Sequence, residues 1–155
     1  MKNAIGIEVE RATELTIKLN DLLANYQVFY QNLRGLHWNV KGKEFFELHL
    51  KFEELYNDAI LKVDEIAERV LTLGGTPLHT LTDYIEESEI KQLKGVTNGP
   101  EGLKHVVANF STLIGKEREI LVLSGDAGDE GTNSLMSDYI TQSEKIVWML
   151  TSYLG

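Results

Sequence analysis

The sequence predicts an all-α protein, a four-helix bundle in which a long crossover carrying a short helix joins helices two and three. Apolar residues recur three and four positions apart along four long segments, which is the period of an amphipathic helix. Neither strand alternation nor a hairpin signal is present. The 155 residues suffice for one domain, 1–155, with a sizeable core.

The first helix is expected from about Glu8 to His37. Its apolar positions are Ala12, Leu15, Leu19, Leu22, Tyr26, Phe29 and Leu33. A polar break from Asn39 to Lys43 separates it from the next helix. Both helices hold about 30 residues, which corresponds to a length of roughly 45 Å each.

The second helix follows this break and ends at Gly74-Gly75, with Pro77 just beyond as a stop signal. Its apolar series is Phe45, Leu48, Phe52, Leu55, Ala59, Val63, Ile66 and Val70. A proline is favourable in a first helical turn, so the third helix is expected from near Pro100 to about Leu123. The fourth follows apolar residues from Met136 to Tyr153.

The connections predict the topology. Short polar breaks join helices one and two, and three and four, which makes each pair antiparallel neighbours. More than twenty residues separate Gly75 from Asn98, and they include the short amphipathic piece LTDYIEESEIKQL. A connection of this length can return along the bundle, which gives the ferritin-like arrangement.

Composition excludes several functions. There is no cysteine, so disulfides, thiolate zinc sites and cysteine nucleophiles are ruled out. The net charge of −9 argues against nucleic acid as a partner and suits cations. No signal-peptide pattern or membrane span is found, so we expect a soluble cytoplasmic protein.

Five residues near the first polar break have a spacing that suits metal ligation. His49 and Glu53 are four residues apart, as are Asp64 and Glu68, so each pair projects from one face of a helix. His37 lies at the end of the preceding helix. His49 and Asp64 are roughly 22 Å apart along a straight helix, too far for one metal centre. Two antiparallel copies of the helix would bring the pairs together, so we predict a metal site between subunits.

Each of these residues also has an ordinary interpretation, since a lone helical histidine is usually a surface or satisfied core residue. Their grouping beside an apolar stripe favours ligation, because burying an unpaired charge is unfavourable. The Glu-x-x-His motif of in-bundle di-iron centres is absent at all four histidines, so that centre is not expected. His79 and His105 are expected to be surface residues without an acidic partner at helical spacing.

The motifs RGLHWNVKG, FxxLHxxFEELY and VDEIAERVLTLGGTP, with the terminal VWMLTSYLG, resemble the Dps family (DNA-binding protein from starved cells), the miniferritins. The resemblance extends over essentially the whole chain. It implies a hollow homododecamer that protects against oxidative damage. Fe(II) would be oxidised, preferably with hydrogen peroxide, at ferroxidase centres on two-fold interfaces, and Fe(III) would be stored as a mineral.

The resemblance also implies roles for single residues. His37, His49 and Glu53 would come from one subunit, and Asp64 and Glu68 from its partner. Glu53 stands where the family often has Asp, so it would ligate directly or through water. Trp38 is either apolar filler at an interface or an electron donor during peroxide reduction.

The acidic loop SGDAGDEGTNS is the remaining candidate region. Asp126, Asp129, Glu130 and Asp138 are ordinary turn and cap residues on composition alone. In the family this region lines three-fold pores for iron uptake, where an acidic ring would concentrate cations.

Two alternatives stay open beside the iron enzyme. The chain could be a metal buffer that holds zinc or manganese, or a shell without iron chemistry. DNA binding is expected to be absent or weak, because only Lys2 precedes the first helix and a dodecamer would carry about −108, twelve times −9.

Overall fold

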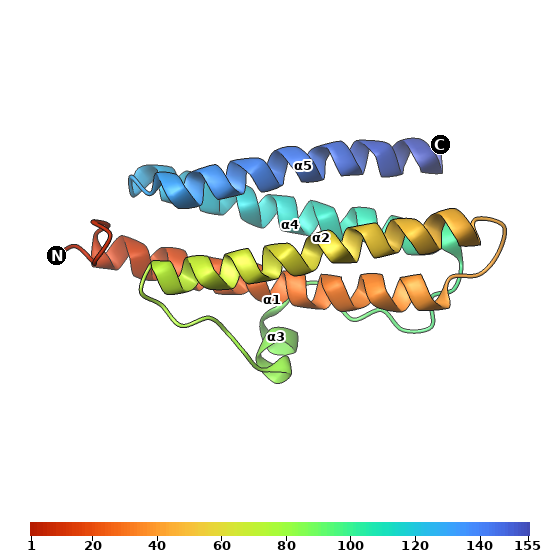
Figure 1. Ribbon diagram of the computed structural model, residues 1–155, viewed down its shortest axis with the longest axis horizontal. Helices are drawn as coiled ribbons and strands as arrows, with labels where there is room; N and C mark the ends of the chain where they lie inside the picture. Colours follow the sequence, from red (N-terminus) through yellow and green to blue (C-terminus); the bar gives the residue numbers. More distant parts are fainter.

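The computed structural model describes all 155 residues and contains five helices and no strand (Figure 1). Four helices are long: α1 (Val9–Asn39), α2 (Phe45–Thr72), α4 (Gly99–Asp126) and α5 (Glu130–Leu154). The remaining helix, α3 (Leu81–Glu87), is short and lies in the crossover. The predicted all-α, ferritin-like fold class is confirmed.

The helices pair as the connection lengths predict. Figure 1 shows α1 beside α2 and α4 beside α5, and contacts between α1 and α4 join the two hairpins. The crossover leaves α2 at one end of the bundle, passes α3 against α1, and reaches the start of α4 at the other end. The return along the bundle is therefore made by the one long connection.

Buried apolar side chains from α1, α2, α4 and α5 form one core. All seven apolar positions expected on the first helix are buried. Phe29 packs edge-to-face on Phe110 of α4, with ring centroids 5.0 Å apart. The apolar stripe thus faces the bundle interior, and its burial is the main favourable contribution to folding.

Helix ends differ from the expected bounds where the terminal turns are polar. α5 begins at Glu130, six residues before Met136, where the predicted apolar series starts, because the Asp129 side chain accepts a hydrogen bond from the Thr132 amide as an N-cap. The crossover helix ends at Glu87, although the amphipathic pattern continues to Leu93.

Buried asparagines of α1 hold the remainder of the crossover in place. Asn25 Oδ1 accepts hydrogen bonds from the amides of Glu89 and Ile90. Asn32 donates to the Lys91 carbonyl and accepts from the Leu93 amide. These side chains satisfy backbone groups that an irregular segment otherwise leaves unpaired, so the segment needs no helix beyond Glu87.

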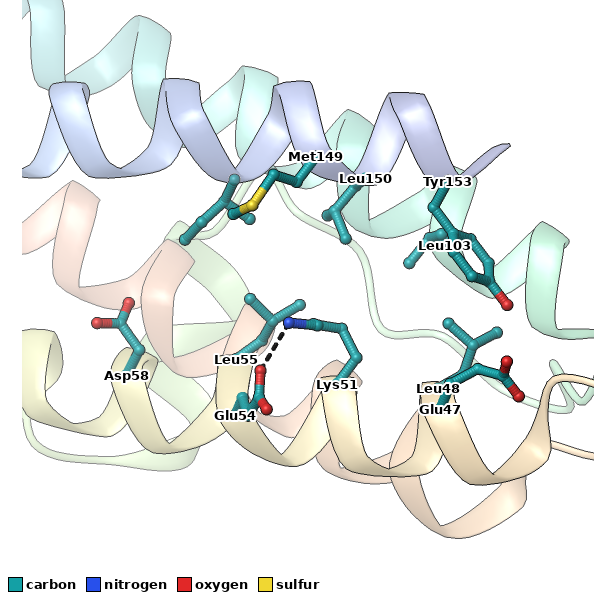
Figure 2. Close-up of a pocket in the computed structure, with 11 residues that line it drawn as sticks. Glu47, Leu48, Lys51, Glu54, Leu55, Asp58, Leu103, Met149, Leu150 and Tyr153 are labelled. Atoms are coloured by element: carbon teal, nitrogen blue, oxygen red, sulfur yellow. Dashed lines mark hydrogen bonds and ion pairs between the residues drawn. The ribbon is translucent and has the colours of Figure 1, made fainter. Parts of the chain in front are cut away.

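A groove of about 410 Å³ separates α2 from α5. Figure 2 shows the side chains of Leu48 and Leu55 opposite Met149, Leu150 and Tyr153. Acidic residues of α2 line the same groove, and the Lys51 ammonium pairs with Glu54 at 2.7 Å. None of the five helices has the length and apolar character needed to cross a membrane.

Candidate metal centre

His37 and His49 hold each other in position across the turn between α1 and α2. His37 lies in the last turn of α1, and its Nδ1 is 2.6 Å from the His49 carbonyl oxygen. The His49 Nδ1 is 2.8 Å from the His37 carbonyl oxygen, and the rings stack with centroids 3.9 Å apart. A carbonyl oxygen only accepts, so each Nδ1 carries a proton, and in the neutral imidazole the lone pair is then on Nε2. Both imidazoles are therefore in the tautomer that can bind a metal through Nε2.

Glu53 completes this first group. It lies one turn after His49 on α2, and its Oε1 is 3.9 Å from the His37 Nε2. The Tyr56 hydroxyl donates a hydrogen bond to the same oxygen at 3.4 Å. Partial burial, followed by the charge of Glu53, raises the pKa of Tyr56, so the hydroxyl keeps its proton at neutral pH. The three residues expected from one subunit are thus neighbours.

Asp64 and Glu68 form a second, separate group further along α2. Both side chains are exposed. Asp64 raises the pKa of Glu68, first through a hydrogen bond between the two carboxyl groups and then through charge repulsion. The structure does not bring this pair to the histidines, and no group of three or more potential ligands in the subunit can hold a metal ion. One subunit therefore presents two half-sites.

Large apolar side chains surround the half-sites on the outer surface of α2. At 3.6 residues per turn, one stripe roughly 80° wide carries both carboxylates and apolar groups. Its residues are Phe46, Leu50, Glu53, Leu61, Asp64 and Glu68. Phe46 is 82% exposed, and Leu50 and Leu61 are more than half exposed. An exposed apolar stripe of this kind marks a surface that another molecule covers.

Comparison with known proteins identifies the family. The sequence model for the ferritin-like domain matches residues 17–155. The chain is 40% identical over 148 residues to the DNA protection during starvation protein of Porphyromonas gingivalis, covering 96% of this chain and 93% of that one. The crystal structure of a Dps protein from Vibrio cholerae O1, described as a ferritin-like diiron-carboxylate protein, superposes with a TM-score of 0.98. It is 51% identical, and the match covers 99% of this chain and 97% of that one. The chain belongs to the Dps family.

Membership of this family implies iron binding, iron storage and protection. The Dps protein of Brevibacillus brevis is a further relative, 40% identical over 140 residues that cover 90% of this chain and 94% of that one. The diiron-carboxylate description suggests ferroxidase activity. Two questions follow for this Dps chain: where iron binds, and which side chains hold it.

A second cluster of ionisable groups lies inside the bundle. Glu117 of α4 is fully buried and accepts a hydrogen bond from the Tyr26 hydroxyl at 2.7 Å. Burial raises the pKa of Glu117 to about 7, although the Tyr26 hydrogen bond and the charge of Lys62 oppose this. The buried Lys62 pairs with Asp58, and its ammonium lies 5.2 Å from the Tyr139 ring centroid. A lysine is therefore the cation of this cluster.

This cluster is not among the sites predicted from the sequence, although the sequence contains a signal for it. Glu117 falls in the apolar period between Leu113 and Ile120, so it lies on the same face of the helix as these core residues. A charged residue on that face is expected to be buried. Lys62 sits beside Val63 at the edge of the apolar series of α2. Because the partners lie on different helices, sequence spacing alone does not connect them.

The acidic loop contributes fewer free carboxylates than its composition indicates. Asp129 is only 2% exposed, and the Arg69 guanidinium binds its Oδ1 at 2.6 Å. Because it also caps α5, Asp129 is a structural residue and not an available pore ligand. Asp126, Glu130 and Asp138 are exposed.

The expectation for His105 was wrong in one respect. Glu101 precedes it by four residues, and Glu101 Oε1 is 3.9 Å from the His105 Nε2. Both side chains are more than two-fifths exposed, so the pair lies at the surface of α4. His79 is exposed, and its Nδ1 is 2.9 Å from the Pro77 carbonyl oxygen.

Proposed function

We propose that this Dps protein is a ferroxidase whose metal centres form between two subunits. His37, His49 and Glu53 of one subunit would face Asp64 and Glu68 of the other. The observation that carries this proposal is the division of the candidate ligands into two separate groups, with Glu53 of the first group on the same outer stripe of α2 as Asp64 and Glu68. An antiparallel two-fold pairing of that stripe joins each half-site to its complement and produces two centres per dimer.

The ligand chemistry suits Fe(II) as the substrate. Neutral imidazole nitrogens and carboxylates form a mixed donor set that accepts Fe(II), and zinc or manganese compete for it. Two Fe(II) ions would each give one electron to hydrogen peroxide. The O–O bond would break, and its two oxygens would take up two protons to form two waters. The reciprocal hydrogen bonds fix the orientation of both histidine rings, so neither ring would need to rotate for its Nε2 to bind the metal.

The product would be stored inside the particle. Twelve subunits would enclose a cavity in which Fe(III) accumulates as a mineral, away from peroxide, in the cytoplasm. Such an assembly would carry about −108, twelve times −9, so DNA binding is proposed to be absent or weak. Asp126, Glu130 and Asp138 are the carboxylates proposed to line the iron-uptake pores.

Trp38 is proposed to act beside the centre. Its side chain follows His37 in sequence, is 56% exposed, and lies under the Arg34 guanidinium at 4.8 Å from the ring centroid. It would cover the interface and donate an electron during peroxide reduction. Replacement by Phe should preserve assembly and increase hydroxyl-radical release in a spin-trap assay; an unchanged signal contradicts the redox role.

The test of the main proposal is anaerobic Fe(II) loading followed by hydrogen peroxide, monitored by near-ultraviolet absorbance together with particle mass. We expect rapid oxidation in a particle of roughly 210 kDa, twelve times 17.5 kDa. The double variant His49→Ala with Asp64→Ala should lose this activity and keep the particle. Glu101→Ala with His105→Ala removes an exposed histidine and carboxylate from another helix and is the matched control.

Intact wild-type particles that oxidise iron no faster than the protein-free solution would overturn the ferroxidase proposal. If such particles bind zinc or manganese at the same residues, the protein is a metal buffer. If they bind no metal, it is a shell without iron chemistry.

A further inference from the structure

Tyr56 is a side chain outside the ligand set that donates a hydrogen bond to the first half-site. It lies one turn after Glu53 on α2, and its hydroxyl donates to Glu53 Oε1 at 3.4 Å. Its ring is held on two sides by edge-to-face contacts. The His37 ring centroid is 5.4 Å away, and the Tyr30 centroid is 6.0 Å away.

Glu53 is the ligand with most need of support. A glutamate has one more rotatable bond than an aspartate, so its carboxylate can occupy more positions. The side chain is 43% exposed, and packing therefore does not fix it. Its Oε1 has the Tyr56 hydroxyl and the His37 Nε2 as neighbours, whereas its Oε2 has no hydrogen-bond partner in the subunit.

We propose that Tyr56 is a positioning residue that selects how Glu53 binds iron. This inference rests on the proposed intersubunit ferroxidase. By holding Oε1, the hydroxyl directs Oε2 toward the metal, so that Glu53 binds through one oxygen and coordination positions stay open for the oxidant. The rings of His37 and Tyr30 fix the hydroxyl in turn, so a flexible glutamate acts with the precision of a shorter ligand.

The experiment compares Tyr56→Phe with the wild type in the assembled particle. Phenylalanine keeps the ring contacts and removes only the hydroxyl. The control is Tyr30→Phe. It also keeps a ring that contacts Tyr56 and removes a hydroxyl, but the hydroxyl of Tyr30 makes no hydrogen bond. Anaerobic Co(II) titration gives the affinity, and the visible absorption bands of Co(II) report its coordination. We expect Tyr56→Phe to weaken Co(II) binding about 10-fold, the lower end of the range for outer-shell partners, and to change the bands. Tyr30→Phe should do neither.

A double-mutant cycle with Glu53→Asp separates positioning from a general structural role. The aspartate is one methylene shorter and withdraws its carboxylate from the hydroxyl. Adding Tyr56→Phe should therefore have no further effect on Co(II) affinity in this background. An equal loss in both backgrounds would overturn the proposal, as would wild-type affinity and bands in Tyr56→Phe alone.

The same titration distinguishes failure of this inference from failure of the proposed function. If the wild type binds Co(II) at the interface and Tyr56→Phe matches it, only the positioning role is lost. If the wild type binds no Co(II), or if its Co(II) affinity does not depend on His49 or Asp64, the interfacial centre and the role of Tyr56 both fail.

Discussion

Helix α2 carries ionisable side chains on two of its surfaces, and the two sets have opposite needs. Inside the bundle, Lys62 pairs with Asp58 and its charge acts on Glu117, so the acidic groups have a cation of their own. On the outer stripe, Asp64 and Glu68 have only each other, and the hydrogen bond between them, followed by their charge repulsion, raises the pKa of Glu68. The interior set has its cation within one subunit, although the buried Glu117 Oε1 has no hydrogen-bond partner there. The outer set needs a cation from elsewhere.

This difference follows from solvation. A charge inside the bundle is acceptable only with a partner, because desolvation without one is strongly unfavourable. At the surface, water stabilises two neighbouring carboxylates until a metal or a second subunit replaces it. The outer pair, which lacks a counter-ion, is therefore the better candidate for metal binding. The pKa shift in the interior cluster, at Glu117, does not change this conclusion.

Removing the outer carboxylates should have the largest effect. Asp64→Asn with Glu68→Gln should weaken Co(II) binding by at least about 100-fold, since two proposed ligands lose their charge. Glu117→Gln, which changes the interior carboxylate in the same way, should leave the affinity within about two-fold of the wild type, because distant sites act independently. Isothermal titration of the assembled particles measures both. A large loss of affinity in Glu117→Gln would reverse the assignment of the two clusters.

Removing the interior cation should affect stability instead. Lys62→Met keeps much of the buried volume but leaves Asp58 and Glu117 without a nearby ammonium, so the free energy of unfolding should fall by about 3 kcal/mol. Lys51→Met, on the same helix and facing Glu54 in an exposed pair, should change it by less than about 1 kcal/mol. Denaturant unfolding at pH 7 compares them, and equal values for the two variants would contradict the proposed difference.

Glu117 should make stability depend on pH. Its folded pKa of about 7 lies above the usual 4.5, so the folded state binds more protons than the unfolded state between these values. Stability is therefore lost as pH rises from about 4.5 to about 7. Glu117→Gln should remove this loss and be more stable than the wild type by about 3 kcal/mol at pH 8, with little difference at pH 4. Thermal unfolding across this range tests the prediction, with the exposed Glu119→Gln on the same helix as control.

The sequence predicts the fold and the two half-sites because both are periodic. Spacings of three and four residues place Leu19 in the core and Asp64 beside Glu68 without knowledge of any other element. The interior cluster depends on the approach of α4 to α2, so neither Lys62 nor Glu117 discloses its partner. Asp129 shows the same limit: in the sequence it is one acid among several, and only its contact with Arg69, sixty residues earlier, makes it structural.

The smallest effect should come from Glu68→Gln in metal-free protein, and it should have the opposite sign to that of Lys62→Met. Neutralising Glu68 relieves the repulsion that raises its pKa, so the midpoint of thermal unfolding in the presence of a chelator should rise slightly at pH 7. The rise should shrink at high salt, because exposed charges are screened. Added Co(II) should then stabilise the wild type and leave the variant nearly unchanged.

A variant less stable than the metal-free wild type would show that the outer pair is satisfied within the subunit, which would remove the distinction between the two surfaces of α2. A pair that lowers the stability of the free subunit while enabling metal binding is expected of side chains retained for function.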